Sequence, residues 1–458
     1  MTGMELWTVR RIADAVGLRV PDDRAITGVS TDTRSIRPGD AFVALRGERF
    51  DAHDFLHDAV KRGAHAVIVD DGARAAGLGV PVLVVEDTLA ALGALGRVFR
   101  TAWARPVVAI GGSNGKTTTK ELIRSALAST FEVHATEGNL NNQIGVPLTL
   151  LGLRDGADIG VVEVGTNVPG EIALLRDIVK ADIAVITTIQ EEHLEGFGSL
   201  EGVMEEEMSL CDEVQLAIVP AAEPGVVAEA RRRARHVMTA GLEMGDLHAD
   251  GWGLERDGTS WMRVGDVMLR VRAPGAHNAA NALLALAVAR ACGVSDTAAA
   301  AGIEWAKLPP MRSAVRTLGD AVLINDAYNA NPGSVRAALE LLDTVALNRP
   351  SVAVLGTMRE LGERTADLHD DVARAALAAP IHLIGAVGEF ARAFARVSPG
   401  DPRVVAAEEP DTLWPALVGR LQRNAAILLK ASRGVRLERM VPHLEAWAGV
   451  ASGGKEPS

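Results

Sequence analysis

Short apolar runs without polar alternation recur along this chain, separated by stretches with helical spacing or by turn residues. Such runs are typical of strands that are buried on both faces of a parallel sheet. Their alternation with helical stretches predicts the α/β fold class. The predicted strands are 41–45, 66–69, 106–110, 159–164, 183–188, 215–219, 321–325, 351–355, 381–387 and 425–429.

The predicted strands fall into three groups, and 458 residues are more than one hydrophobic core usually holds. We therefore predict three α/β domains: an N-terminal domain at 1–103, a central domain at 104–311 and a C-terminal domain at 312–458. The tail at 451–458 is rich in Gly, Ser and Lys, and we expect it to fray.

Composition narrows the classes of function. The chain has 47 Lys+Arg against 59 Asp+Glu, a net charge of -12, which argues against a protein that coats nucleic acid. No apolar run reaches the roughly 18 residues that a membrane span needs, and the start of the chain becomes charged before a signal-peptide core could form. Cys211 and Cys292 suit two buried thiols in a reducing compartment. We expect a cytoplasmic protein that binds no nucleic acid, does not insert into membranes and acts as a monomer.

The strongest chemical signal is the glycine-rich segment GGSNGKTTT at 111–119, between a predicted strand and a helix that begins near Thr117. A loop of this kind presents backbone N–H groups and the positive end of a helix dipole to a phosphate. Lys116 would contact the β- and γ-phosphates, and the Thr117 hydroxyl would contact Mg²⁺. Ile110 replaces the first glycine of the strict Walker pattern. The predicted nucleotide-binding residues of this loop are Gly112, Ser113, Asn114, Gly115, Lys116, Thr117 and Thr118.

Two further predicted strands end near ionisable side chains. Glu163 interrupts a buried strand close to its C-terminal end, where open α/β sheets bind ligands, and a buried carboxylate favours a metal site. His193 follows the strand at 183–188, either as a ligand or as a surface residue. No HExxH spacing accompanies it, so Mg²⁺ is favoured over zinc. The amide-rich segment 139–147, which includes Asn142, is either a ligand-binding segment or a turn-rich loop.

At this point the chain resembles the Mur ligase superfamily, the ATP-dependent amide ligases of peptidoglycan synthesis, essentially from end to end. The stretches that carry the resemblance are GSNGKTTTKE (112–121), NLNNQIGVPLTLL (139–151), EVGTNVPGEI (163–172), HLEGFGSLEGV (193–203), PGAHNAANALLALA (274–287), INDAYNANPGSVRAAL (324–339), AVLGTMRELGE (353–363) and KASRGVRLE (430–438).

The resemblance implies a UDP-substrate-binding N-terminal α/β domain, a central P-loop ATPase-type sheet domain and a Rossmann-like C-terminal domain. It implies that ATP, with Mg²⁺, converts the carboxylate of UDP-N-acetylmuramoyl-tripeptide to an acyl phosphate. D-alanyl-D-alanine would then attack, giving the UDP-linked pentapeptide, ADP and phosphate, in cell-wall synthesis. Because the matching residues are spread over three domains, we expect the domains to close together before transfer.

The resemblance also implies roles for particular residues. Lys116, His193, Glu207 and Lys430 match catalytic positions. Thr117 and Glu163 match the ligands of one Mg²⁺ ion, and His193 matches a ligand of a second ion, with Glu207 beside it. Positions matching ATP contacts are Asn142, His277, Asn278, Asn281, Arg312 and Asp326, although one of the residues at 277–281 could instead cap a helix. Positions matching substrate contacts are Ser30, Thr31, Arg34, Gly47, Asp51, His53, Asn329, Asn331, Ser432 and Arg433.

The chain departs from the family pattern in the central domain. Glu207 stands where most relatives carry a lysine that is carbamylated and supports Mg²⁺, and no lysine occurs between Lys180 and Lys307. We hypothesise that the Glu207 carboxylate replaces the carbamate; a solvated acidic helix face, or a register that selects Glu206, are the alternatives. Gln143 also stands where the family frequently has an acidic residue, Thr188 where it frequently has Asn, and Thr357 where it frequently has Asp.

Two other functions remain open from the sequence. A paralogue could join a different amine to a different carboxylate, and a non-catalytic switch could use ATP only to close its domains. Retention of Lys116, Thr117, Glu163 and His193 favours an enzyme over the switch. The third residue of the peptide substrate, lysine or diaminopimelate, is also open.

Overall fold

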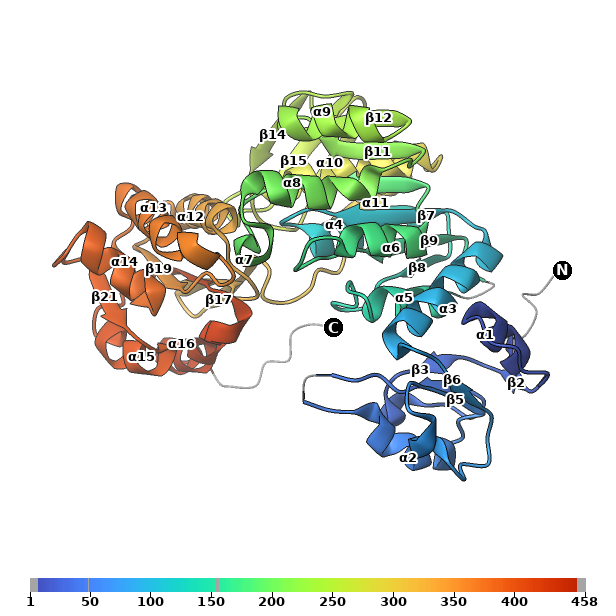
Figure 1. Ribbon diagram of the computed structural model, residues 1–458. Coiled ribbons are helices and arrows are strands. Elements are labelled where there is room, and N and C mark those ends of the chain that lie inside the picture. Colours follow the sequence, from blue (N-terminus) through green and yellow to red (C-terminus); the bar gives the residue numbers. More distant parts are fainter. Residues whose placement is uncertain (1–6, 48, 154–155, 451–458) are drawn as a thin grey trace.

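The computed structural model describes residues 7–47, 49–153 and 156–450, and it contains three α/β domains in chain order (Figure 1). The predicted fold class is therefore confirmed. The tail at 451–458, which we expected to fray, lies outside the described residues. No helix in the described part of the chain combines the length and the apolar character that a membrane crossing requires.

The N-terminal domain is built on a four-stranded parallel sheet in the order β3-β4-β5-β6, with a separate antiparallel pair, β1 and β2. Strands β4 and β5 are buried along their whole length, as the apolar runs predicted. The elements are β1 (Trp7–Thr8), α1 (Val9–Ala15), β2 (Ala25–Ile26), β3 (Val29–Ser30), η1 (Thr33–Ser35), β4 (Ala41–Val43), η2 (Ala52–Phe55), α2 (Leu56–Lys61), β5 (Ala66–Val69), η3 (Gly72–Ala75), β6 (Val82–Val84) and α3 (Thr88–Trp103).

Helix α3 joins the first domain to the second. The Asp87 side chain caps its N-terminus by accepting from the backbone N–H groups of Leu89 and Ala90. A Cβ atom at Gly96 would lie 3.0 Å from Pro147, so the helix packs closely on the central domain. The domain boundary that we predicted at residue 103 therefore falls at the end of a helix whose buried face is shared with the central domain.

The central domain contains a seven-stranded parallel sheet in the order β13-β12-β11-β10-β7-β9-β8. Val108 and Ile110 of β7 face α4, α10 and α11, while Val107 and Ala109 face the opposite helical layer. Because both faces of the sheet are covered, its strands appear in the sequence as unbroken apolar runs. The elements are β7 (Val107–Gly111), α4 (Lys116–Leu127), β8 (Val133–Ala135), α5 (Gly145–Leu151), β9 (Ile159–Glu163), α6 (Glu171–Val179), β10 (Ile183–Ile186), α7 (Leu194–Phe197), α8 (Leu200–Met208), η4 (Ser209–Cys211), β11 (Leu216–Pro220), α9 (Pro224–Arg233), β12 (His236–Gly241), β13 (Leu247–His248), β14 (Gly251–Leu254), β15 (Ser260–Val264), β16 (Val267–Val271), α10 (Ala276–Ala291) and α11 (Asp296–Glu304).

The C-terminal domain contains a six-stranded sheet in the order β17-β18-β22-β19-β20-β21. All of its neighbouring pairs are parallel except β17 with β18. The elements are β17 (Ala314–Leu318), β18 (Ala321–Asp326), α12 (Pro332–Ala346), β19 (Ser351–Gly356), η5 (Gly362–Arg364), α13 (Thr365–Ala378), β20 (Leu383–Val387), α14 (Glu389–Val397), β21 (Val404–Ala407), α15 (Pro410–Val418), β22 (Ala426–Lys430), η6 (Arg433–Val435), η7 (Leu437–Arg439) and α16 (Met440–Ala448).

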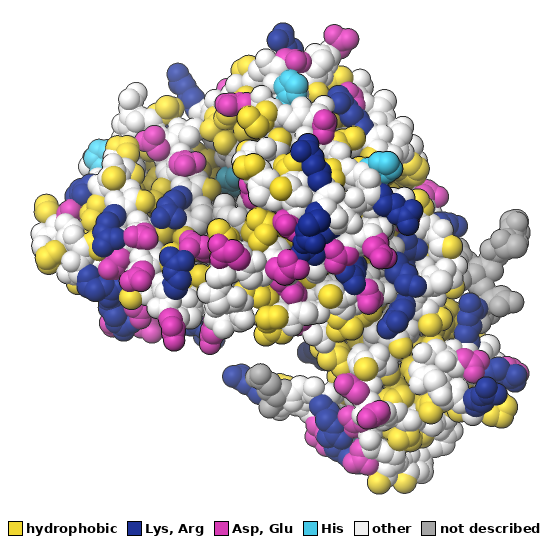
Figure 2. All heavy atoms as spheres, turned by 45° about the horizontal axis from the view of Figure 1, so that its top comes forward, with side chains coloured by type: hydrophobic (Ala, Val, Ile, Leu, Met, Phe, Trp, Pro, Cys, Tyr) yellow, Lys and Arg dark blue, Asp and Glu magenta, His cyan; other side chains and the backbone are white. Residues whose placement is uncertain are grey.

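The arrangement of the domains brings two sets of strand ends to one place. Strands β7 and β9 of the central sheet end at Gly111 and Glu163, and strands β18 and β22 of the C-terminal sheet end at Asp326 and Lys430. Side chains from both sets line a single cavity. On the face shown in Figure 2, acidic and basic side chains are interspersed.

The two cysteines are reduced. Cys211 is buried and burial raises the pKa of its thiol to about 12, whereas Cys292 is only partly buried. The prediction of two buried thiols is therefore correct for Cys211 and only partly correct for Cys292.

Candidate functional site

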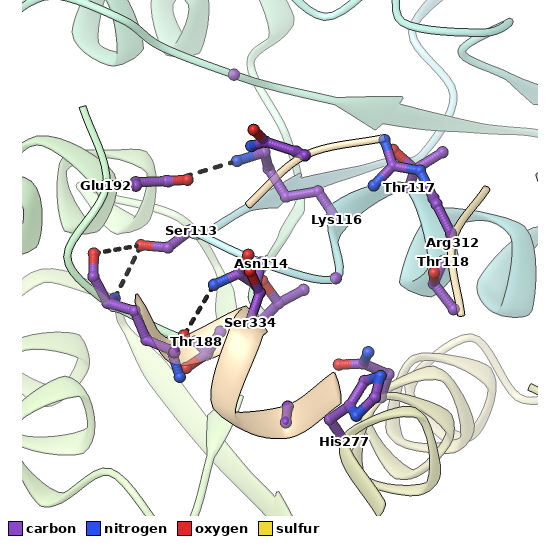
Figure 3. Close-up of a pocket in the computed structure, with 18 of the residues that line it drawn as sticks. Ser113, Asn114, Lys116, Thr117, Thr118, Thr188, Glu192, His277, Arg312 and Ser334 are labelled. Carbon is purple, nitrogen blue, oxygen red and sulfur yellow. Dashed lines mark hydrogen bonds and ion pairs between the residues drawn. The ribbon is translucent and has the colours of Figure 1, made fainter. Parts of the chain in front are cut away.

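A cavity of about 400 Å³ lies between the central and C-terminal domains (Figure 3). It gathers residues that are far apart in the sequence, from the phosphate loop near 113 to β22 at 430. The predicted site residues that line it are Ser113, Asn114, Gly115, Lys116, Thr117, Thr118, Asn142, Glu163, His193, His277, Asn278, Asn281, Arg312, Asp326, Asn329 and Lys430.

The phosphate loop connects β7 to the N-terminus of α4. Gly112 has φ +113°, and a Cβ atom there would lie 2.4 Å from the Thr187 hydroxyl, so only glycine fits. Gly115 occupies the N-cap position with φ +82°. The first N–H groups of this helix are therefore free to face a ligand in the cavity, which is the geometry of an anion site. The Lys116 ammonium folds back to donate to the carbonyl oxygen of Gly112.

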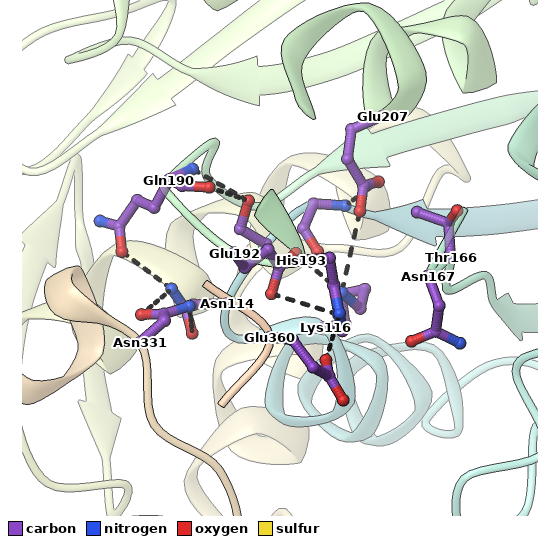
Figure 4. A network of polar contacts seen from close by, with 12 residues as sticks. Asn114, Lys116, Thr166, Asn167, Gln190, Glu192, His193, Glu207, Asn331 and Glu360 are labelled. Carbon is purple, nitrogen blue, oxygen red and sulfur yellow. Dashed lines mark hydrogen bonds and ion pairs between the residues drawn. The ribbon is translucent and has the colours of Figure 1, made fainter. Parts of the chain in front are cut away.

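Three buried carboxylates surround Lys116, and Figure 4 shows two of them, Glu192 and Glu207. Its Nζ lies 3.8 Å from Glu192 Oε1 and 3.9 Å from Glu207 Oε1, and Glu163 is the third. Burial alone would lower the pKa of Lys116, but these carboxylates outweigh it, so the pKa lies above its ordinary value. Burial raises the pKa of Glu192 to about 7 and also raises that of Glu207, with Lys116 opposing both shifts. One cation therefore faces three acidic groups.

Two of these carboxylates each have one oxygen that makes no hydrogen bond. Glu163 Oε1 accepts from Thr117 Oγ1 at 3.2 Å and from Asn141 Nδ2 at 2.8 Å. Among the described residues, Glu163 Oε2 and Glu207 Oε1 are buried and make no hydrogen bond. Buried carboxylate oxygens of this kind beside excess negative charge suit a hard divalent cation. The described part of the chain holds no cluster of three His, Cys, Asp or Glu residues that could bind a metal by itself.

The three consecutive glutamates of α8 point in different directions. Glu205 is exposed and pairs with Arg233, as on a solvated face. Glu206 is buried and accepts from the N–H groups of Gly170 and Ile172, both at 2.8 Å, at the start of α6. Glu207 is fully buried and accepts from the N–H of Gly112 in the phosphate loop at 2.7 Å. The alternative of a solvated acidic face is thus wrong for Glu206 and Glu207, and the register that selects Glu207 agrees with the geometry.

His193 stands at the N-cap position of α7 in a left-handed backbone conformation, φ 47°. Its Nδ1 lies 2.5 Å from Glu360 Oε2 of the C-terminal domain, and its Nε2 lies 3.9 Å from Glu192 Oε2. Burial works to lower the pKa of His193, but the contact with Glu360, together with the charge of Glu192, raises it above its ordinary value. Neither Glu192 nor Glu360 was singled out from the sequence.

The residues at 277–281 lie in the first turns of α10, opposite the phosphate loop. Asn281 Nδ2 contacts Asn278 Oδ1 at 3.4 Å, so these two amides share a face as predicted. Asn278 donates to the carbonyl oxygen of Pro274. The N-cap residue is Gly275, which has no side chain, so the alternative in which one of these residues caps the helix is wrong. Burial lowers the pKa of His277.

Asp326 and Lys430 face each other across neighbouring strands at 2.6 Å, and Asp326 also accepts from the backbone N–H of Ser313. Asp326 therefore forms an ion pair with the buried ammonium of Lys430. The Arg312 guanidinium lies 4.1 Å above the ring of Tyr328, on the cavity wall. All of these groups come from the C-terminal domain or the segment leading into it.

Three other predicted residues, Asn331, Ser432 and Arg433, are not part of the cavity wall as the described residues define it. Asn331 is buried, caps α12 and exchanges two hydrogen bonds with Asn114, at 3.1 and 3.0 Å. Ser432 is also buried and accepts from the backbone N–H of Arg359. Arg433 is exposed beside Glu438. Asn142 lines the cavity, but its side chain accepts from the N–H groups of two following residues, so it also forms the turn that we considered.

The predicted residues of the N-terminal domain form a separate group, outside the lining of the cavity as the described residues define it. Ser30 is buried and bonds within its own loop, and the His53 side chain is fully buried between Asp51 and Asp70. The side chain of Arg34, by contrast, is 86% exposed. The other members of this group are Thr31 and Gly47, neither of them buried.

Comparison with known families gives three matches in chain order. Residues 25–100 match the model described as "Mur ligase family, catalytic domain", residues 110–289 match "Mur ligase middle domain", and residues 311–433 match "Mur ligase, glutamate ligase domain".

Individual proteins match over nearly the whole chain. The UDP-N-acetylmuramoyl-tripeptide–D-alanyl-D-alanine ligase of Bacillus subtilis is 33% identical, with 95% of this chain and 98% of that protein covered. The enzyme of the same name from Escherichia coli is 35% identical, with 92% and 94% covered. Among solved structures, MurF from Acinetobacter baumannii superposes with a TM-score of 0.87 at 32% identity, covering 96% and 99%. MurF from Thermotoga maritima in complex with ADP gives 0.81 at 27% identity, covering 92% and 98%.

Proposed function

The chain belongs to the Mur ligase family, and we propose from this premise that the cavity between its central and C-terminal domains is the active site of an ATP-dependent amide ligase. The reaction joins D-alanyl-D-alanine to UDP-N-acetylmuramoyl-tripeptide, in peptidoglycan precursor synthesis. The observation that carries the site assignment is the phosphate loop, whose Lys116 faces three buried carboxylates at the domain interface.

In this reaction, a carboxylate oxygen of the tripeptide forms a bond to the γ-phosphorus of ATP, and the bond from that phosphorus to the β,γ-bridging oxygen breaks. The amine of D-alanyl-D-alanine then attacks the acyl carbon and loses a proton, and inorganic phosphate leaves with the bonding electron pair. The first step brings two anions together, so it needs fixed positive charge. The N-terminus of α4 and Lys116 supply that charge from the protein.

Magnesium fits the remaining charge of the site. Thr117 and Glu163 would hold one ion, and His193 and Glu207 would stand beside a second. The oxygens of Glu163 and Glu207 that make no hydrogen bond would accept the metal ions. When bound, the metal would neutralise charge on the transferring phosphoryl group. Since the protein alone offers no complete ligand set among its described residues, ATP oxygens and water would complete the coordination.

The other groups would bind and position the substrates. Asn278 and Asn281 would contact ATP opposite the loop, and Lys430, held by Asp326, would face the acyl phosphate or the incoming amine. The N-terminal domain would bind the UDP end of the tripeptide substrate. We propose that the enzyme works in the cytoplasm as a monomer.

A phosphate-release assay tests this function directly. We expect ATP hydrolysis to require both D-alanyl-D-alanine and UDP-N-acetylmuramoyl-tripeptide, with the pentapeptide product detected by mass spectrometry. Tripeptides that contain lysine and diaminopimelate, assayed in parallel, would identify the third residue. Turnover that requires a different amine would identify a paralogue, and absence of turnover with both substrates would contradict the proposal.

A further inference from the structure

The contact between His193 and Glu360 joins the central domain to the C-terminal domain at the edge of the site (Figure 4). Both residues have left-handed backbones, with φ 47° at His193 and φ 65° at Glu360. Non-glycine residues seldom adopt this conformation, and it tends to persist where the surrounding structure requires it, often at functional sites. Here two such residues meet across a domain interface.

Backbone contacts fix the same interface. The carbonyl oxygen of Glu360 accepts from the N–H of Glu195 at 3.1 Å, in the first turn of α7. A Cβ atom at Gly362 would lie 3.1 Å from the Cα of Glu195, so the loop approaches the helix closely. Arg364 adds an ion pair with Glu191 at 2.8 Å. The segment 360–364 is therefore docked on the segment that carries His193.

The geometry of the imidazole gives its two nitrogens different roles. Nδ1 lies 2.5 Å from the Glu360 carboxylate, whereas Nε2 is directed toward Glu192, at 3.9 Å from Oε2. Glu192 in turn lies 3.8 Å from the ammonium of Lys116, which also faces Glu207. Nε2 therefore faces the carboxylate cluster of the site, and Nδ1 faces the other domain. The ring of Phe197 meets the imidazole edge to face at 6.5 Å and restrains it further.

We propose that Glu360 is a positioning residue: it accepts the Nδ1 proton of His193 and thereby presents Nε2 to the magnesium ion of the active site. This inference rests on the proposed function of the site. A carboxylate that holds the distal N–H of a metal-binding histidine fixes the tautomer and the ring orientation, and it makes the imidazole a stronger ligand. In this chain the carboxylate comes from a different domain than the histidine.

The division between domains has a functional consequence. His193 is oriented as a ligand only while the C-terminal domain is docked, so metal binding and docking favour each other. Such coupling is reciprocal, because a metal that binds the docked state more tightly also stabilises that state. The enzyme would thereby complete its metal site only after the C-terminal domain has closed the cavity, when water is kept from the acyl phosphate.

The test measures metal binding separately from catalysis. Mn²⁺ replaces Mg²⁺, and its affinity for the full-length protein with saturating ADP is measured by electron paramagnetic resonance. Loss of an outer partner of a metal-binding histidine commonly weakens metal binding about 10–100-fold, so we expect that loss for Glu360→Ala. Glu360→Gln keeps an oxygen that accepts the Nδ1 proton but removes the charge, so its affinity should fall between Glu360→Ala and the wild type.

Two control variants separate positioning from simple docking. Glu363→Gln changes an exposed carboxylate in the same segment and should bind Mn²⁺ like the wild type. Arg364→Ala removes the ion pair with Glu191 but leaves His193 and Glu360 in place, so its Mn²⁺ affinity should change much less than that of Glu360→Ala.

Steady-state kinetics give a second measurement. Glu360→Ala should raise the Mg²⁺ concentration required for half-maximal turnover, while excess Mg²⁺ restores most of kcat. Wild-type Mn²⁺ affinity in Glu360→Ala, or an equal loss in Arg364→Ala, would overturn the positioning role. Failure of the wild-type protein to form the pentapeptide would instead contradict the proposed function, whatever the Mn²⁺ data show.

Discussion

Replacing Glu207 by glutamine tests whether this carboxylate takes the place of the family's carbamylated lysine. The substitution keeps the size of the side chain and an oxygen that can accept from the N–H of Gly112, and it removes one negative charge. It should therefore leave the phosphate loop in place while changing the charge that faces Lys116 and the metal. Because no modification by CO₂ is needed, we also expect the wild-type enzyme to be indifferent to added bicarbonate.

The distance between Lys116 and Glu207 gives the strength of the attraction that the substitution weakens. At 3.9 Å and an effective dielectric constant of about 20, the attraction between Lys116 and Glu207 is about 4 kcal/mol. This gross attraction acts in the ground state and is not itself a rate effect. Loss of one preorganised electrostatic contact in an active site commonly costs on the order of 10²–10³-fold in rate, and we expect turnover to fall by that amount. Stability should change little, because the variant avoids the cost of burying a carboxylate and Lys116 keeps Glu192 and Glu163 as partners.

The assay is phosphate release across a magnesium titration, with thermal unfolding as the check on folding. Glu205→Gln is the matched control on the same helix, and it should match the wild type because Glu205 is exposed and pairs only with Arg233. Glu206→Gln should instead lower the unfolding temperature, since Glu206 accepts the N–H groups at the start of α6. If Glu207→Gln has the turnover and the magnesium requirement of the wild type, the carboxylate does not serve the metal.

Three further predictions follow from the same geometry. Lys116→Ala should lower pentapeptide formation at least 10²–10³-fold at saturating ATP with an unchanged circular dichroism spectrum, and wild-type turnover would contradict the phosphate-loop assignment. Arg34→Ala should raise the KM for UDP-N-acetylmuramoyl-tripeptide but leave the KM for ATP and the stability unchanged, because the Arg34 side chain is exposed in the N-terminal domain, away from the cavity. An unchanged KM for UDP-N-acetylmuramoyl-tripeptide would exclude Arg34 from the UDP site. In the metal-free protein, burial raises the pKa of Glu192 to about 7 from 4.5, so the folded state holds its proton longer and the free energy of unfolding falls as pH rises through this window. Glu192→Gln removes that loss, so its stability advantage in urea unfolding should grow from near zero below about pH 4 to about 3 kcal/mol at pH 8, and a pH-independent difference would show that Glu192 is not the group that titrates.

The parallel strands of the larger sheets were the most predictable part of the fold. Each predicted run overlaps a strand, as at β7, β9 and β22, because burial on both faces leaves a continuous apolar signal. The antiparallel strands β14–β16 were missed because they are only half buried and so give no continuous apolar run. Asp257-Gly258 and Gly265-Asp266 lie between these strands, and such dipeptides are hairpin signals that apolar runs alone do not contain.

Within the site, motif and resemblance together found the loop, the amides of α10 and the carboxylates Glu163 and Glu207, because each belongs to a compact segment of recognisable residues. Glu192 was missed although it adjoins His193. The acidic segment around Glu192 does not indicate which of its glutamates will be buried beside Lys116. Its burial is decided by the path of β10 into α7 relative to Lys116, which no local pattern records.

Side-chain contacts between different domains could not be predicted from the sequence for the same reason. Asn331 belongs to a recognisable motif and was assigned to the substrate, yet it is buried against Asn114, 217 residues away in the chain. Glu360 also lies in a matching stretch, but its contact with His193 depends on how the C-terminal domain docks. Sequence patterns identify residue types suited to a reaction, while docking of the domains decides which of those residues touch. The candidate site is therefore a property of how the domains are arranged, and the variants most informative about it are those that change a contact between domains without changing either domain's core.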